Sequence, residues 1–75
     1  MNLVDEFKNA ANSAASKHGL TCDFKVLVNS DAFVASFHNA DAHANAAISG
    51  LEIKIFDEPL RIFKGRINQA IQLLG

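Results

Sequence analysis

The sequence lacks several features that would narrow its function, and each absence excludes something. The 75 residues include one cysteine, Cys22, which excludes an internal disulfide and a cysteine-based zinc site. No stretch approaches the roughly 18 consecutive apolar residues of a membrane span. Residues 1–19 contain Asp5 and Glu6 in place of the apolar run of a signal peptide. We therefore expect a cytoplasmic protein that does not associate with membranes.

Motifs for catalysis are also lacking. The sequence contains no G-x-S-x-G, no glycine-rich phosphate loop and no H-E-x-x-H, and its four glycines are scattered. The carboxylate pairs Asp5-Glu6 and Asp57-Glu58 suit the first turns of helices, where they complement the helix dipole. A chain of this length also has little room for a deep substrate pocket. We expect a protein that is not an enzyme and that binds no cofactor.

Charge is nearly balanced, with seven Lys and Arg against eight Asp and Glu and a net charge of -1. This balance argues against general affinity for nucleic acid and equally against an acidic mimic of DNA. Over residues 60–75, however, the only charged side chains are basic: Arg61, Lys64 and Arg66. These three residues are the candidates for binding a partner with acidic character.

Two segments predict amphipathic helices. Residues 3–18 carry a 3.6-residue apolar stripe, with Asn2 as the N-cap and Gly19 in the left-handed position after the helix. Residues 60–74 carry a second stripe, with Asp57 as the N-cap and Pro59 where no N–H is needed. Gly65 within that stripe costs about 1 kcal/mol relative to alanine. This cost leaves a fourth strand over 60–63 as the alternative.

Two stretches alternate with period 2 and predict strands, 20–28 and 32–38. Paired residues in an antiparallel hairpin must share a face, and two registers satisfy this rule. One closes on a two-residue turn at Asn29-Ser30. The other has a four-residue loop over 29–32 and places Leu27 opposite Val34. We favour the longer loop because Asn-Ser is a weak two-residue turn.

The middle of the chain is ambiguous. Residues 39–50 are rich in alanine and asparagine and predict either a short helix or a mobile connection; we favour the helix. Residues 51–56 alternate again and predict a third strand, with Leu51, Ile53 and Ile55 inward and Phe56 outward. A three-stranded sheet with one apolar face and two amphipathic helices closes into two layers.

The expected fold is therefore a single α+β domain over residues 1–75. It has two layers, with a three-stranded, mainly antiparallel sheet and the N- and C-terminal helices on one face, in the order α-β-β-(short α)-β-α. Its helix, three strands and helix are an order shared with double-stranded-RNA-binding domains. Those domains place lysines at the start of the last helix to contact phosphates, whereas Asp57 and Glu58 stand there in this chain and would repel the backbone.

Histidine and cysteine offer the remaining chemistry. His38 and His43, with Asp41 between them, form a possible metal cluster, but their spacing matches no standard zinc pattern and we expect no metal site. His18 suits the C-terminal end of a helix. Cys22 faces inward on the first strand, where it is a packing residue. We assign no catalytic role to any of these residues.

Apolar residues that two layers cannot bury indicate an interface. Leu27, Val34 and Phe56 face away from the predicted helices, unless segment 39–50 folds over them, and we predict that they mediate self-association as a homodimer. By analogy of size with bacterial and phage accessory proteins, we expect a module that binds and modulates or inhibits a larger protein machine. The alternative is a nucleic-acid-associated regulator that uses the basic C-terminal helix.

Overall fold

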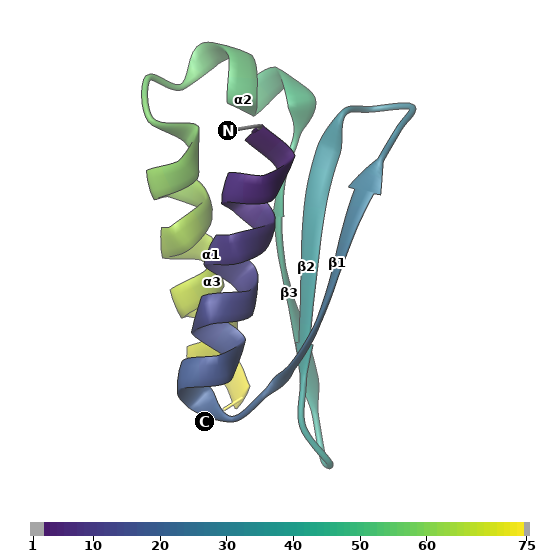
Figure 1. The fold of residues 1–75 in the computed structure, drawn as a ribbon, viewed down its shortest axis with the longest axis vertical. Coiled ribbons are helices and arrows are strands. Elements are labelled where there is room, and N and C mark those ends of the chain that lie inside the picture. The colour runs from purple at the N-terminus through teal and green to yellow at the C-terminus, as the bar shows by residue number, and fades with distance from the viewer. Residues whose placement is uncertain (1–2, 75) are drawn as a thin grey trace.

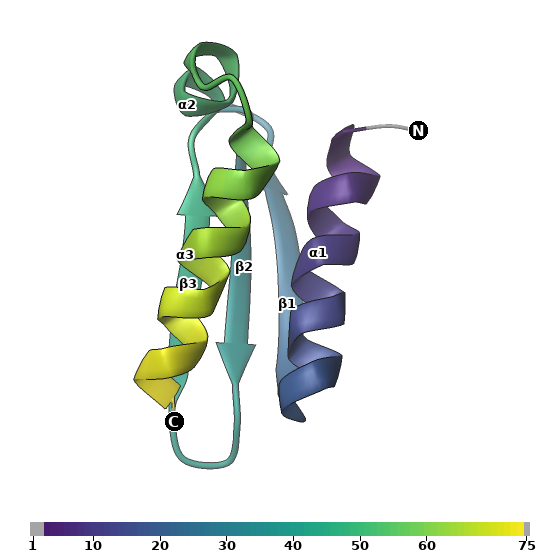
Figure 2. The ribbon, with the colours of Figure 1, turned by 90° about the vertical axis from the view of Figure 1, so that its left-hand side faces the viewer.

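The computed structural model describes residues 3–74 as two layers, a sheet and a pair of long helices (Figure 1). The elements are α1 (Leu3–His18), β1 (Thr21–Leu27), β2 (Ala32–His38), β3 (His43–Ile48), α2 (Gly50–Ile55) and α3 (Pro59–Leu74). The strands form one antiparallel sheet in the order β1-β2-β3. Helices α1 and α3 lie on one face of it (Figure 2). The predicted α+β class, with terminal helices on one face of a three-stranded sheet, is confirmed.

Helix α1 ends as the sequence predicts. Gly19 has a positive φ of 66°. Its N–H donates to the Ser16 carbonyl oxygen at 3.3 Å, and the Leu20 N–H donates to that of Ala15 at 2.9 Å. These two bonds form a Schellman motif, which satisfies two of the last four carbonyl groups of the helix. The predicted cap at Asn2 lies outside the described residues.

The β1–β2 hairpin has the other of the two registers we considered. Leu27 pairs with Ala32, not with Val34, so the favoured pairing was wrong. The turn explains the difference. The Leu27 carbonyl oxygen accepts a bond from the Ser30 N–H at 3.2 Å, and Asp31 adopts a left-handed φ of 52°. Aspartate tolerates this conformation, so the chain reverses before Ala32.

The third strand and the short helix are exchanged relative to the prediction. Segment 39–50, predicted as a short helix or a mobile connection, contains strand β3, and segment 51–56, predicted as a strand, contains most of helix α2. β3 forms because it pairs with β2 and buries its inward side chains, Ala44, Ala46 and Ile48. Because alanine has a low strand propensity, the sequence pattern did not predict this strand.

Helix α2 begins with a capping box. The Glu52 N–H donates to Ser49 Oγ at 3.1 Å, and the Ser49 N–H donates to Glu52 Oε1 at 3.0 Å. These reciprocal bonds satisfy two N–H groups at the helix start. Phe56 ends the helix, and its side chain packs against the core. The alternation over 51–56 therefore belongs to a helix that leaves Leu51 and Ile55 exposed.

Helix α3 is unbroken from Pro59 to Leu74, so the long helix is confirmed and the alternative strand over 60–63 was wrong. Pro59 is its first residue, where the missing N–H costs nothing. The residue that precedes it is Glu58, whose carbonyl oxygen accepts the Ile62 N–H at 3.3 Å. The predicted N-cap at Asp57 was therefore one residue too early.

The core joins both layers through phenylalanine. The Phe7 ring lies 4.8 Å from that of Phe33 and 5.2 Å from that of Phe63, so one aromatic cluster joins α1, β2 and α3. Phe24 of β1 adds a half-buried ring 5.7 Å from Phe33. Among the described residues no polar or charged side chain is buried. Every candidate functional group of residues 3–74 is therefore at or near the surface.

Candidate functional site

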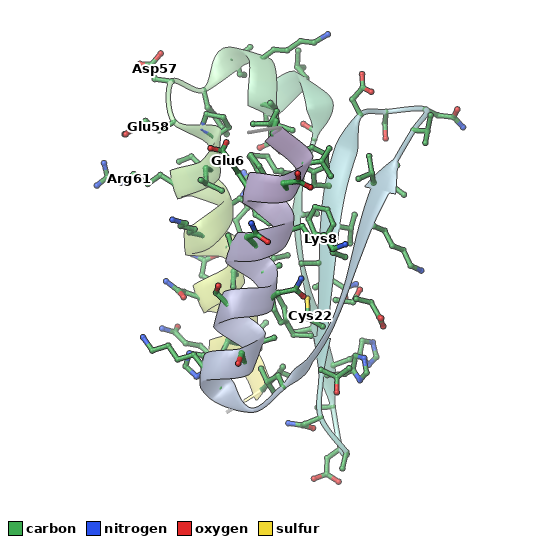
Figure 3. All side chains as sticks on the ribbon, in the orientation of Figure 1. Glu6, Lys8, Cys22, Asp57, Glu58 and Arg61 are labelled. Atoms are coloured by element: carbon green, nitrogen blue, oxygen red, sulfur yellow. The ribbon has the colours of Figure 1, made fainter. Side chains whose placement is uncertain are left out.

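The three basic residues of the last helix do not form one free cationic surface. Arg66 makes a bidentate contact with Glu52, at 2.9 Å from Nη1 to Oε1 and 2.6 Å from Nη2 to Oε2. Its Nη1 also donates to the Ala47 carbonyl oxygen at 3.0 Å. Arg61 forms an exposed pair with Glu58 at 3.3 Å, on the outer side of the start of α3 (Figure 3). Arg66 therefore holds α2 and β3 against α3. While its guanidinium makes these contacts, it is not free to bind an acidic partner.

The bridge between Arg66 and Glu52 sets the protonation of the carboxylate. Hydrogen bonds from the Arg66 guanidinium, and then the bond from the Ser49 N–H, lower the pKa of Glu52 from 4.5 to about 2. A carboxylate whose pKa is lower in the folded state contributes stability above its unfolded pKa and loses it as pH falls through the folded one. The contribution is therefore present at neutral pH and fades in acid.

We expect a Glu52→Gln variant to be less stable than the wild-type protein at pH 7, and the difference to shrink between about pH 5 and pH 2 as the wild-type Glu52 takes up a proton. Urea unfolding at a series of pH values, followed by circular dichroism, measures this. Glu58→Gln is the matched control because the pair between Glu58 and Arg61 is exposed, and such pairs contribute little. A constant difference between Glu52→Gln and wild type across this pH range would contradict the assignment.

The structure separates the residues we predicted for self-association. Leu27 and Val34 lie on the sheet face opposite the helices, as diagonal neighbours in the β1–β2 register. Phe56 does not share that face, because segment 51–56 is not a strand and Phe56 packs against the core at the end of α2. The helix-free face carries mostly small and polar side chains beside Leu27 and Val34. It does not form the contiguous apolar patch that the sequence indicated.

The histidines His38 and His43 do meet, as directly opposed residues of β2 and β3. His38 Nε2 also lies 3.4 Å from Asp23 Oδ2 on β1. Asp41 is in the connecting turn, where Asn39 Oδ1 accepts its N–H at 2.8 Å. Within residues 3–74 no three His, Cys, Asp or Glu side chains are placed to hold a metal ion.

Cys22 is half-buried between β1 and α1 (Figure 3). Burial, and to a lesser extent the neighbouring Asp23 carboxylate, raises the pKa of its thiol. A raised pKa keeps the thiol protonated at neutral pH, whereas nucleophilic cysteines have a lowered pKa. The environment of Cys22 therefore suits a packing residue.

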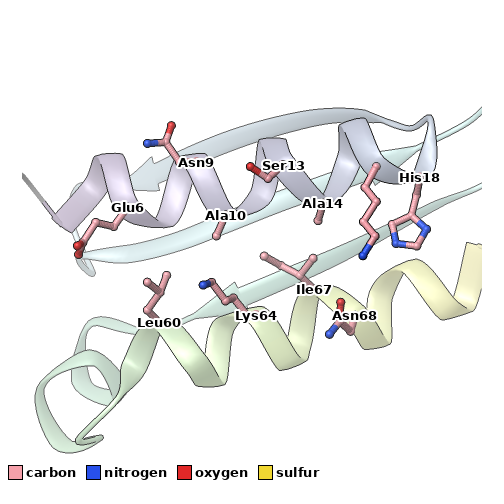
Figure 4. Close-up of a pocket in the computed structure, with 11 residues that line it drawn as sticks. Glu6, Asn9, Ala10, Ser13, Ala14, His18, Leu60, Lys64, Ile67 and Asn68 are labelled. Carbon is pink, nitrogen blue, oxygen red and sulfur yellow. The ribbon is translucent and has the colours of Figure 1, made fainter.

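A groove of about 510 Å³ runs between α1 and α3 and is lined by residues of these two helices only (Figure 4). Its floor includes Ala10, Ala14 and Ile67. Glu6 stands at one end and Lys64 near the middle (Figure 4). The groove thus presents charges of both signs over a floor of mainly small residues. This arrangement selects no particular class of ligand.

Exposed apolar side chains gather at one end of the molecule. Of the eight large apolar residues that are exposed within 3–74, six belong to the start of α1, the end of β1 and its turn, and α2. These segments lie together at the same end (Figure 1), and Gly50 at the start of α2 abuts the hairpin turn. We call this region the apolar end; its residues are Leu3, Val26, Leu27, Val28, Leu51 and Ile55, of which Leu27 points to the helix-free face of the sheet.

A pocket of about 320 Å³ opens within the apolar end. Most of its lining is apolar, from α1, the two hairpin strands and α2: Leu3, Val4, Val26, Phe33 and Ile53, together with Gly50, Asp31 and Lys54. An apolar pocket with exposed apolar side chains in its lining, here Leu3 and Val26, is typical of a site that accepts an apolar anchor from another protein.

Two features of this end were not predicted from the sequence. The Ser49-x-x-Glu52 spacing is a capping-box signature and could have placed the start of α2. The alternation of Ala44, Ala46 and Ile48 could have placed β3. With those two elements assigned, Leu51 would have fallen on an exposed helix instead of an inward strand face.

No family model, curated protein or solved structure matches this chain. In the part of the chain that the structure describes, no helix has the length and apolar character needed to cross a membrane.

Proposed function

We propose that the protein is a small, non-enzymatic, cytoplasmic module that binds and modulates a larger protein assembly, and that its contact surface is the apolar end. Six of the eight exposed large apolar residues lie at this end, and two of them, Leu3 and Val26, line its pocket, which supports the proposal. Scattered apolar residues are normal on a surface, whereas their concentration at one end beside an apolar pocket favours an interface. The free thiol of Cys22 suits a reducing compartment.

The same surface would form the homodimer. A standard interface covers about 800 Å² on each partner, which is roughly one sixth of the 4944 Å² of accessible surface. A domain of this size also has a small core, and burial of apolar surface between two copies adds to its stability. A second copy is therefore the first occupant to test.

The nucleic-acid alternative loses support from the positions of the basic residues. Arg66 is held by Glu52 and Arg61 is paired with Glu58. Lys64 remains, in the groove between the helices that Glu6 also lines. A phosphate-binding surface needs several cations on one face, free to contact the backbone.

Light scattering coupled to size exclusion tests the proposal. We expect the wild-type protein to dimerise at high micromolar concentration and a Leu51→Glu/Ile55→Glu variant to be monomeric. These side chains are 69% and 64% exposed, so the folded monomer tolerates the charges while an apolar interface does not.

Leu73→Glu is the matched control, because Leu73 is 81% exposed but lies near the end of α3, outside the apolar end. It should dimerise like the wild type. A wild-type protein that stays monomeric at these concentrations would contradict the homodimer, and equal loss of dimer in both variants would contradict the assigned surface. Circular dichroism of each variant confirms that it is folded.

A further inference from the structure

Strand β1 is an outer strand with a regular free edge. It pairs with β2 residue for residue from Thr21 to Leu27, without a bulge, and no other strand of the described chain lies on its outer side. The strand contains no proline. Its edge therefore presents backbone N–H and C=O groups in the geometry that pairs with another extended chain.

The inward face of β1 is also incompletely covered. Every inward side chain of β2 and β3 is buried. On β1, by contrast, Cys22 and Phe24 are only half-buried and Val26 is 39% exposed. Helix α1 runs along the outer side of β1 (Figure 2). A chain added beside β1 would lie under α1 and would cover these apolar side chains.

We propose that β1 binds an extended segment of a partner protein as a fourth, antiparallel strand, with an acidic, an apolar and a basic residue opposite Lys25, Phe24 and Asp23. Main-chain hydrogen bonds supply affinity in such strand addition, and alternate side chains supply specificity. Asp23 and Lys25 are exposed on the outer face, where the Asp23 carboxylate also lies 3.4 Å from His38 Nε2. Opposite charges directly across a strand pair stabilise it. The apolar residue would pack on Phe24 beneath α1.

The residue order required of the partner also occurs in β1 itself, because Asp23, Phe24 and Lys25 are an acidic, an apolar and a basic residue in that order. A second folded copy is nevertheless excluded as the occupant. The two-fold axis of that pair stands at right angles to the sheet, midway between the two copies of Phe24, so both α1 helices lie on the same face. With strands about 4.8 Å apart, these helices would approach closer than the 8–10 Å that packed helices need. The occupant is therefore an extended segment that carries no covering helix.

A synthetic peptide of residues 20–28 with Cys22→Ser is a suitable probe, because it supplies the complementary triplet without α1. The control peptide has its Asp and Lys exchanged, which keeps the composition but places like charges opposite Asp23 and Lys25. We expect the first peptide to shift the amide resonances of β1 and slow their hydrogen exchange. We expect the control peptide to bind about tenfold more weakly, because like charges destabilise a strand pair.

A protein variant with the two charges of β1 exchanged should reverse the preference between the two peptides. In Asp23→Lys/Lys25→Asp the control peptide should become the tighter ligand, a result that general stickiness of the peptides cannot produce. Equal binding of the two peptides, shifts confined to the groove between α1 and α3, or no binding at millimolar peptide would overturn the proposal. The Leu51→Glu/Ile55→Glu variant should still bind the peptide, so failure at β1 and failure at the apolar end are separable.

Discussion

A Phe7→Ala variant is expected to lose most of the free energy of unfolding. Phe7 is fully buried, and its ring contacts Phe33 and Phe63 at the junction of α1, β2 and α3. Truncation of a core phenylalanine to alanine typically costs about 3–5 kcal/mol. A domain of this size without disulfide or metal has a core that supplies roughly 3–5 kcal/mol. The variant is therefore expected to be largely unfolded at room temperature.

Circular dichroism during urea unfolding measures this effect, and it is the appropriate probe because the chain has no tryptophan or tyrosine. Phe24→Ala is the matched control. Its ring also contacts Phe33 and Phe63, but it is only half-buried on the outer strand. We expect Phe24→Ala to lose about half as much free energy of unfolding as Phe7→Ala, because the Phe24 side chain buries less apolar area on folding. Similar unfolding midpoints for Phe7→Ala and wild type would contradict the assigned core.

A Gly50→Ala variant is expected to be destabilised by about 1–3 kcal/mol, the usual range for an overpacked site. A Cβ atom at Gly50 would lie 2.5 Å from the Ser30 carbonyl oxygen and 2.9 Å from Asp31 Cβ. The carbonyl belongs to the backbone of the hairpin turn, so it cannot rotate away as a side chain could. The substitution therefore forces α2 and the β1–β2 turn apart.

Gly65→Ala is the control, because it makes the same chemical change in a helix with nothing within 4 Å of the new Cβ. We expect it to stabilise the protein by about 0.5–1 kcal/mol, since alanine is the better helix former. Urea unfolding of the two variants should thus move in opposite directions. Stabilisation by Gly50→Ala would show that α2 does not pack against the turn.

Periodicity predicted α1, α3 and β2 correctly, because each has a strong local pattern. The apolar stripe of α3 outweighs the cost of Gly65, and Gly19 marks the end of α1. These signals also sufficed for the fold class. Where local preference and tertiary pairing agree, a single sequence specifies its structure well.

The prediction failed where tertiary contacts decide. β3 is built on Ala44 and Ala46, which have low strand propensity, and it exists because β2 and α3 cover both its edge and its face. The hairpin register depends on the conformation of Asp31, which no pattern of apolar residues encodes. Both errors affected the predicted self-association surface. The position of Phe56 depended on the third strand, and the pairing of Leu27 depended on the hairpin register.

The basic residues show a different limit. A count of charges along 60–75 cannot reveal that Arg66 lies against Glu52, fourteen residues earlier in the chain. The apolar end is likewise assembled from three segments that are distant in the sequence. Of its residues, only Leu27 was predicted from the sequence to lie in an interface. A surface formed by long-range packing becomes visible once the fold is known.

Photo-cross-linking in the producing host tests the assigned surface most directly. Benzoylphenylalanine placed at position 51 should form covalent adducts with a protein partner or a second copy, because Leu51 lies in the apolar end. The same group at position 73 on α3, where Leu73 is 81% exposed against 69% for Leu51, should form none. Adducts from position 73 as abundant as those from position 51, or no adduct from position 51, would contradict the account.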